Sequence, residues 1–173
     1  MKIATEFTKG KLDNSIMMRH DLVAGFVVKN KYKRIAEVGV KVGENAYAII
    51  RRCADTGYRL EKFYLVDPDV PSCAIPFDDN PEVERIVKIS TEASKDVPDN
   101  SLDLVYIDAN HEYEFVMDDI KYWLPKIKKG GIICGHDYDI DSRDGVRKAV
   151  EDSFDRYNLQ SEVGTYNWWK YVE

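Results

Sequence analysis

Residues 102–113 read LDLVYIDANHEY and form the most strand-like segment of the chain. The first part, 102–108, is an apolar run with almost no polar interruption, which is typical of a parallel strand buried on both faces. Asp108 and the turn that follows it gather two carboxylates, an amide, an imidazole and a phenol, which is unusual for a plain connection. We therefore predict a buried strand whose carboxyl end carries polar groups for binding or catalysis.

Further strand patterns lie on both sides of this segment and alternate with helical ones. Strands are predicted at 34–40, 62–67, 86–89, 102–108 and 132–135, and helices up to about 30, over 46–57, within 92–96, over 113–124 and over 146–154. The pieces 159–163 and 167–172 should pair as a hairpin around Gly164. Lys129, Gly130 and Gly131 are predicted as the turn that leads into the fifth strand.

The regular alternation predicts an α/β fold in which crossovers place helices on both faces of a sheet. We predict a Rossmann-like, seven-stranded, mostly parallel sheet with a C-terminal antiparallel hairpin. The whole chain, 1–173, is expected to be a single domain, with a leading helix in 1–30 and the terminal hairpin in 159–173.

The composition excludes several classes of protein. The 173 residues are 44% hydrophobic and 32% charged, which is ordinary globular usage. A net charge of -6 would repel phosphate backbones and anionic lipid heads, so we expect no nucleic-acid or membrane partner. Cys53, Cys73 and Cys134 lack disulfide or zinc-site spacing, and the N-terminus lacks the apolar core of a signal peptide. These features predict a soluble, cytoplasmic protein.

The first predicted strand ends in a glycine-punctuated turn. Gly39 can adopt backbone angles that a side chain forbids, and Gly43 lets the next helix begin close to the strand. A dinucleotide-binding fingerprint would also need glycines where Lys41 and Glu44 stand, which disfavours a nicotinamide-dependent oxidoreductase. The spacing is equally compatible with an ordinary tight turn between a strand and a helix.

Two other strand ends carry candidate ligand-binding groups. Asp67, which ends the second strand, could accept hydrogen bonds from a ribose diol, or could be a turn aspartate before Pro68. The fifth strand ends in 135–138, GHDY, and should face the same pocket as the polar turn after 108. His111 and His136 could each be chemical or structural histidines.

Taken together, the blocks 37–43, Asp67, 102–113 and 130–138 resemble a class I S-adenosylmethionine-dependent methyltransferase. The likeness covers about 34–154. It is most specific in the strand ends Ile-Asp-Ala-x-His-x-Tyr and Gly-His-Asp-Tyr, which are similar to those of a small-molecule methyltransferase branch.

The resemblance implies a role for each matching residue. The cofactor-binding residues implied are Glu37, Gly39, Val40, Gly43, Asp67, Ser90 and Asp108. Glu37 and the two glycines would line the methionine and ribose parts of S-adenosylmethionine, and Ser90, expected to end the third strand, would lie beside the adenine. The acidic residue that usually precedes this serine is replaced by Ile89, and the third glycine by Lys41.

Methyl transfer to a hydroxyl needs alignment of the acceptor and removal of a proton. The catalytic residues implied are His136, His111 and Asp137, with His136 the first choice as base because imidazole titrates near neutral pH. Some relatives bind a divalent cation at matching positions, so Asp108, His136 and Asp137 are a possible site for magnesium or manganese.

We therefore predict O-methylation of a small molecule such as a sugar or a catechol, by a protein that could be a homodimer. The alternatives are a non-catalytic S-adenosylmethionine-binding module, a nicotinamide-dependent oxidoreductase and a sugar or nucleotide hydrolase. Tyr138, Trp168 and Trp169 could form an aromatic wall of the acceptor site or could be core residues.

Overall fold

The computed structural model describes residues 14–69, 77, 79–138, 144–155, 159–162 and 165–173. The strands are β1 (Arg34–Val38), β2 (Lys62–Val66), β3 (Val83–Ile86), β4 (Leu102–Ile107), β5 (Ile127–Gly135), β6 (Gln160–Glu162) and β7 (Asn167–Tyr171). They form one seven-stranded sheet in the order β3-β2-β1-β4-β5-β7-β6. The first five strands run parallel, and β7 runs antiparallel to β5 and β6. The predicted fold class and terminal hairpin are confirmed.

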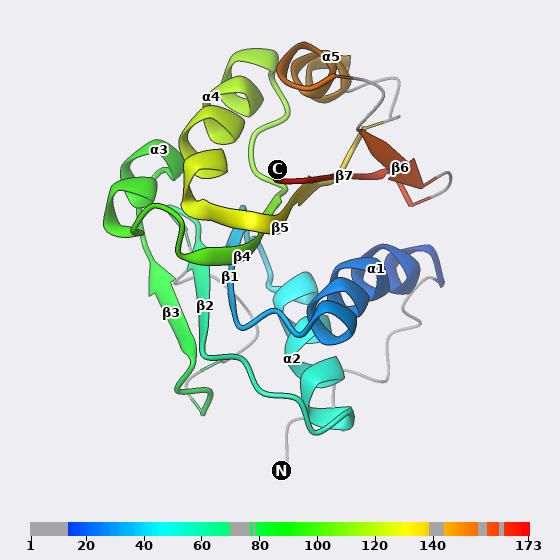
Figure 1. Cartoon of the computed structure of the whole chain (residues 1–173), viewed down its shortest axis with the longest axis vertical. Coiled ribbons are helices and arrows are strands. Elements are labelled where there is room, and N and C mark those ends of the chain that lie inside the picture. The colour runs from blue at the N-terminus through cyan, green and yellow to red at the C-terminus, as the bar shows by residue number, and fades with distance from the viewer. Residues whose placement is uncertain (1–13, 70–76, 78, 139–143, 156–158, 163–164) are drawn as a thin grey trace.

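Helices cover both faces of this sheet. They are α1 (Asn14–Asn30), α2 (Glu44–Asp55), α3 (Ser90–Ala93), α4 (Tyr113–Trp123) and α5 (Asp144–Ser153), with 3-10 turns η3 (Ser94–Asp96) and η4 (Leu124–Lys126). α1 and α2 lie on one face, and α3, α4 and α5 lie on the other (Figure 1). No helix in the described part of the chain is long and apolar enough to cross a membrane.

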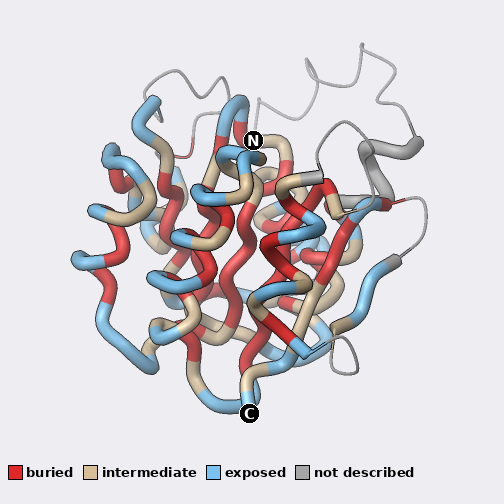
Figure 2. Tube along the Cα trace, turned by 90° about the horizontal axis from the view of Figure 1, so that it is seen from above, coloured by how far each residue is buried: buried red, intermediate tan, exposed pale blue. Residues whose placement is uncertain are grey.

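Side chains of the central strands alternate between two cores, as a pleated strand requires. Ile35 belongs to the core that contains Val23 of α1, and the adjacent Ala36 belongs to the core that contains Val116 of α4. Figure 2 shows the result, with buried residues along the central strands and exposed residues on the outer sides of the helices. Because both faces are covered, ligands can reach these strands only at their ends.

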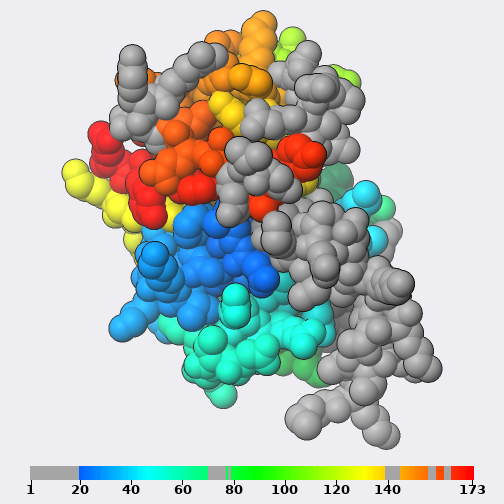
Figure 3. All heavy atoms as spheres, turned by 90° about the vertical axis from the view of Figure 1, so that its right-hand side faces the viewer, coloured from blue at the N-terminus to red at the C-terminus, as the bar shows by residue number. Residues whose placement is uncertain are grey.

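The adjacent tryptophans of β7 pack into these two cores. Trp168 lies 6.1 Å from Phe154 between ring centroids, and Trp169 lies 5.5 Å from Phe26 of α1. The second contact brings the C-terminal strands against α1, as the space-filling view shows (Figure 3). Both tryptophans therefore pack structurally, as one of the two alternatives for them predicted.

The third strand lies three residues earlier than the apolar run at 86–89 predicts. β3 pairs with β2 from Val83 opposite Phe63 to Ile86 opposite Val66. Because β2 ends at Val66, the chain beyond Ile86 has no strand to pair with, and Ile89 is 58% exposed. The predicted strand at 86–89 is therefore wrong, and Ser90 begins α3 rather than ending a strand.

The fifth strand begins earlier than predicted, at Ile127 rather than Ile132. Leu102 pairs with Ile127 and Leu104 pairs with Ile132, so the register shifts between these two pairs. Gly130, with a φ of 82°, lies in this irregular part. The glycines predicted as a turn before the strand thus form an irregularity within it, which is a common place for glycine.

Candidate active site

A pocket of about 700 Å³ lies at the carboxyl ends of the parallel strands. β1 lies between β2 and β4, so the strand order reverses at this point, where open α/β sheets bind ligands. The predicted site residues that line the pocket are Glu37, Gly39, Val40, Asp67, Ser90, Asp108, His111, His136 and Asp137. Gly43 is instead the N-cap of α2, with a φ of 88°.

The turn after β1 is held tightly against the end of β4. Gly39 has a φ of 90°, and a Cβ atom at this position would lie 2.2 Å from the carbonyl oxygen of Asp108. The Gly39 amide donates to the carbonyl of Val66 at 2.8 Å, which joins the turn to β2 as well. Only glycine fits here, because both the backbone angle and the close approach exclude a side chain.

Asp67 ties this turn to the end of β2. One carboxylate oxygen accepts from the amides of Val40 at 2.9 Å and Lys41 at 3.0 Å, and the other accepts from the amide of Asp69 at 2.8 Å. A carboxylate offers about four acceptor positions, so capacity for a ligand hydroxyl remains. The structure thus gives Asp67 a role in shaping the turn in addition to the predicted contact with a ribose.

A buried polar chain closes the pocket on the side of α1. Asn45 donates through Nδ2 to Glu37 Oε2 at 3.1 Å, and its Oδ1 lies 3.3 Å from Nδ1 of His20. His20 and Glu37 are 5% and 2% exposed, and all three residues line the pocket. The sequence does not predict that His20 and Asn45 line the site, because no local pattern says that α1 meets the glycine turn.

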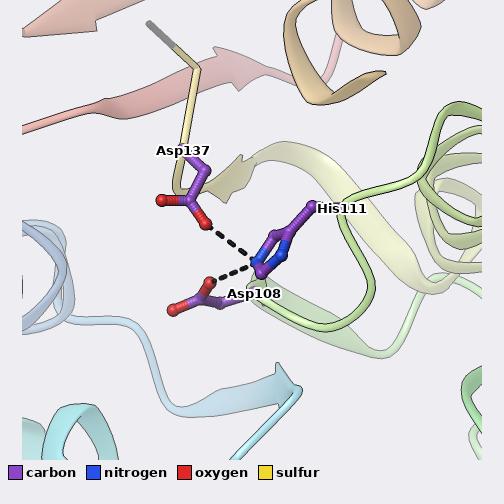
Figure 4. A group of neighbouring side chains, drawn as sticks. All are labelled: Asp108, His111 and Asp137. Carbon is purple, nitrogen blue, oxygen red and sulfur yellow. Dashed lines mark ion pairs between the residues drawn. The ribbon is translucent and has the colours of Figure 1, made fainter. Parts of the chain in front are cut away.

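Three side chains from the ends of β4 and β5 converge on one point (Figure 4). Nε2 of His111 lies 2.8 Å from Asp137 Oδ2 and 3.6 Å from Asp108 Oδ1. One potential ligand atom from each residue lies within 4.8 Å of the other two, which is a spacing that could hold a metal ion. The structure therefore groups Asp108 and Asp137 with His111, whereas the sequence suggested His136 as the third ligand.

His136 contacts the same carboxylate from its other side. Its Nδ1 lies 2.8 Å from Asp137 Oδ1, and the imidazole is 7% exposed. Asp137 Oδ1 has no hydrogen-bond partner of good geometry among the described residues, so this contact is a close charge contact rather than a well-directed hydrogen bond. A carboxylate beside Nδ1 still favours the tautomer that carries its proton there, which leaves Nε2 to accept a proton. The geometry thus suits His136 to act as a base and His111 to act as a partner of both carboxylates.

Asp137 is the buried centre of this group. Its side chain is 1% exposed, and its φ is 64°, in a region that aspartate adopts more readily than most residues. Burial raises the pKa of this carboxyl, but its close contacts with the His111 and His136 imidazoles outweigh burial and hold the pKa well below its usual range. Asp137 is therefore ionised at neutral pH, and each of its two oxygens lies 2.8 Å from a ring nitrogen of one of the histidines.

Where α3 and α4 meet the pocket, its lining contains a hydroxyl and a buried carboxylate. Ser90, now at the start of α3, accepts a hydrogen bond from Nε1 of Trp123 at 2.8 Å. Asp119 of α4 lies beside it in the pocket lining and is 3% exposed. Sequence reasoning did not select Asp119, although its position one helical turn before Trp123 places both residues on the inner side of α4.

A family model described as a methyltransferase domain matches residues 36–138. A short match, 36% identical over 53 residues, links the chain to "Uncharacterized protein y4gI" of Sinorhizobium fredii; it spans 31% of this chain and 6% of that protein.

Solved structures share the fold at low sequence identity. The Podospora anserina methyltransferase PaMTH1, bound to S-adenosylhomocysteine (SAH), is 15% identical with a TM-score of 0.71, over 97% of this chain and 85% of that one. The Bacillus cereus O-methyltransferase in complex with SAH is 14% identical with a TM-score of 0.69, over 90% and 81%. CalS11, a TDP-rhamnose 3'-O-methyltransferase of calicheamicin biosynthesis, is 16% identical with a TM-score of 0.70, over 94% and 80%.

Proposed function

The chain belongs to the methyltransferase domain family, and on that basis we propose that it transfers the methyl group of S-adenosylmethionine to a hydroxyl of a small molecule. One observation carries the proposal: a single pocket joins the glycine turn and Asp67 to the group of Asp108, His111, His136 and Asp137. The first part suits a nucleoside, and the second suits proton removal from an acceptor.

The residues present fit S-adenosylmethionine. The pocket, at about 700 Å³, is within the usual range for cofactor sites. Gly39 leaves the backbone bare where a ligand would lie against it, and Asp67 has an acceptor position for a ribose hydroxyl. The buried carboxylate of Glu37 suits the ammonium group of the methionine part. When bound, the cofactor supplies a methyl group on a positively charged sulfur.

The protein's own contribution would be alignment and proton removal. We assign His136 as the base, because the Asp137 carboxylate lies 2.8 Å from its Nδ1 and so favours the tautomer whose Nε2 can take the proton of an acceptor hydroxyl. His111, at 34% exposure, lies nearer the mouth of the pocket and would orient the acceptor. Alignment of the two reactants is the larger contribution to the rate in such a displacement.

We also propose a divalent cation at Asp108, His111 and Asp137. Two carboxylates and an imidazole form a donor set that suits manganese or iron better than magnesium, which prefers oxygen ligands. A cation there would take the lone pair of His111 Nε2 in place of its contact with Asp137, so His111 would then be a ligand rather than the group that orients the acceptor. The cation would supply that orientation and polarise the acceptor hydroxyl. Exhaustive chelation should then lower turnover at least about tenfold, with recovery on adding manganese. Full activity after chelation would remove the cation from the proposal and leave His136 as the base.

The acceptor is proposed at the level of its chemistry. CalS11 is described as acting on a rhamnose hydroxyl, and the proton-removing group here suits sugar or phenolic hydroxyls. A non-catalytic module that only binds S-adenosylmethionine would have no use for the His136–Asp137 pair.

Two measurements test the proposal. Calorimetric titration should show binding of S-adenosylmethionine and of SAH, and a panel of sugars, catechols and amino acids should be screened for acceptor-dependent release of SAH. Binding together with release in the presence of a hydroxyl acceptor supports the assignment. Absence of any heat with either compound contradicts it.

A further inference from the structure

The plane of the His136 imidazole is not fixed by its contact with Asp137. Nδ1 lies 2.8 Å from Asp137 Oδ1, in a close charge contact rather than a well-directed hydrogen bond. Attraction between charges depends on their distance, whereas a directed hydrogen bond also constrains the plane of a ring. A second contact is therefore needed to keep Nε2 aimed at an acceptor.

The ring of Tyr166 supplies such a contact. Its centroid lies 6.2 Å from that of the His136 imidazole, and the two ring planes cross at 85°. Edge-to-face packing is one of the arrangements that aromatic rings prefer, so a rotation of the imidazole out of this plane loses the contact. Tyr166 is 42% exposed and His136 is 7% exposed, so a surface ring packs against a buried one.

The turn between β6 and β7 places Tyr166 at this point. β7 pairs antiparallel with β5, so the turn before β7 lies beside the residues that follow β5. The amide of Tyr138 donates to the carbonyl of Tyr166 at 3.0 Å, which joins the turn to that segment. Thr165 and Asn167, on either side of Tyr166, are buried, and the Asn167 amide donates to the Thr165 hydroxyl at 3.4 Å. Buried neighbours therefore hold the exposed tyrosine in place.

The backbone of Tyr166 is in the left-handed region, with a φ of 56°. This conformation is uncommon for a large side chain, because it brings Cβ close to a carbonyl oxygen. It persists only where the surrounding contacts fix it, and residues of this kind gather at functional sites. Asp137, which contacts the same imidazole, also has a positive φ, of 64°. Both contacts therefore depend on backbone conformations that the chain adopts at an energetic cost.

We propose that Tyr166 is a positioning residue, which holds the imidazole of His136 in the plane where Nε2 faces the acceptor. This inference rests on the proposed function. Tyr166 acts through His136, which lines the pocket, whereas Tyr166 itself is not among the residues of the lining. The terminal hairpin thereby contributes to turnover and not to cofactor binding. One aromatic contact supports about a 2- to 10-fold difference in the population of the productive orientation.

The test compares loss of the ring with loss of the hydroxyl alone. Tyr166→Leu removes the ring, so kcat with the acceptor identified by the screen should fall about 2- to 10-fold, while KM and the affinity for SAH change less than about twofold. Tyr166→Phe keeps the ring and should keep the wild-type kcat. Tyr171→Leu, the same change at another exposed tyrosine of the hairpin, is the matched control and should also keep it.

Nuclear magnetic resonance follows the imidazole without an acceptor. The nitrogen shifts of the ring report its tautomer, and the signals of His136 are those that disappear in His136→Gln. The wild-type protein and Tyr166→Phe should show one form of His136, protonated on Nδ1, and Tyr166→Leu should show a mixture of both neutral forms. A nuclear Overhauser contact between the two rings should be present in the wild-type protein.

The outcomes separate the inference from the function on which it rests. Absence of SAH binding by the wild-type protein overturns the proposed function and the inference together. Normal SAH binding with an unchanged kcat, or with unchanged His136 signals, in Tyr166→Leu overturns the inference alone, as does a loss of kcat that Tyr171→Leu reproduces. Should Tyr166→Leu not fold, the wild-type protein decides, since absence of the contact between the two rings rejects the assignment.

Discussion

At the scale of single residues, Asp137 determines how the candidate site works. One carboxylate oxygen faces His111 and the other faces His136, each at 2.8 Å. Asp137 is the second residue after the end of β5 and directly follows His136. Its backbone is in the left-handed region, with a φ of 64°, and in this conformation its carboxylate contacts both histidines. The two histidines therefore depend on one buried negative charge for their orientation.

Asp137→Asn should separate orientation from charge. An asparagine has one oxygen and one NH₂ group, so it cannot accept from both histidines, and one of them must change its tautomer or its position. We expect turnover to fall about 100-fold or more, while the affinity for SAH changes less than about threefold. Steady-state rates and calorimetry measure the two quantities. The exposed Asp79→Asn is the control, and wild-type turnover in Asp137→Asn would refute the assigned role.

Asp119 should make stability depend on pH with the opposite sign from a paired carboxylate. Burial raises its pKa from 3.8 to about 6, although the Ser90 hydrogen bond lowers it. Because the folded state holds the proton more tightly than the unfolded chain, this stabilisation is complete below pH 3.8 and is lost as the pH rises through about 6. The loss amounts to about 2 to 3 kcal/mol.

Asp119→Asn removes this titration. The unfolding free energy of the variant minus that of the wild-type protein should therefore rise by about 2 to 3 kcal/mol between pH 4 and pH 7. Urea unfolding at several pH values measures the difference, in which the other titrating groups cancel. A difference that stays constant across this range would mean that the buried carboxyl has an ordinary pKa.

The sequence predicts the site residues that follow strands but not those brought in by packing. Gly39, Asp67, Asp108 and Asp137 were selected because parallel strands end at one edge of a sheet. Their arrangement was not predictable, and the structure pairs His111, rather than His136, with both carboxylates. His20, Asn45 and Asp119 reach the pocket only because helices far apart in the sequence pack around it, and no local pattern encodes that packing.

At the scale of elements, the apolar pattern predicts which segments are strands better than where they end. β4 fits its prediction because both of its faces are covered, so apolar character and strand length coincide. β3 is an edge strand, and its length is set by pairing with β2 rather than by its own composition. Ile89 was predicted to lie in this strand because it is apolar. In the structure it is exposed and lines the pocket.

The turn after β1 should tolerate no side chain. Gly39→Ala would place a Cβ 2.2 Å from the carbonyl oxygen of Asp108 at a φ of 90°, so the ends of β1 and β4 would have to separate. We expect a loss of at least about 3 kcal/mol in unfolding free energy, measured by urea denaturation. Gly25→Ala in α1 is the matched control, because its Cβ meets nothing within 4 Å, and it should stabilise by about 0.5 to 1 kcal/mol. Equal stability of the two variants would show that the turn is not constrained.

At the scale of the whole molecule, the candidate site is assembled from both halves of the sheet. The connections after β1, β2, β3, β4 and β5 all contribute to its lining, and α1 contributes His20. A ligand in the pocket would therefore bridge segments that are otherwise joined only through the sheet and its two cores. The alternation of strands and helices predicted this arrangement, since it fixes where parallel strands end.

Ligand binding should stabilise the entire fold rather than one loop. SAH at 100 times its Kd adds about 2.7 kcal/mol if it binds only the folded state, which for a domain of this size raises Tm by about 5 to 10 °C. Thermal unfolding at several SAH concentrations measures the rise. Because the lining comes from so many connections, the unfolding transition should remain single as it moves to higher temperature.

Asp67→Ala tests whether this stabilisation depends on the predicted nucleoside contact. The variant loses the hydrogen bonds to the glycine turn as well as a ribose contact, so its own Tm should fall and the SAH-induced rise should shrink by more than half. Asp79→Ala, an exposed aspartate outside the pocket lining, should keep both the wild-type Tm and the wild-type rise. A full SAH-induced rise in Asp67→Ala, starting from a lowered Tm, would leave Asp67 its structural role in the turn and remove it from nucleoside recognition.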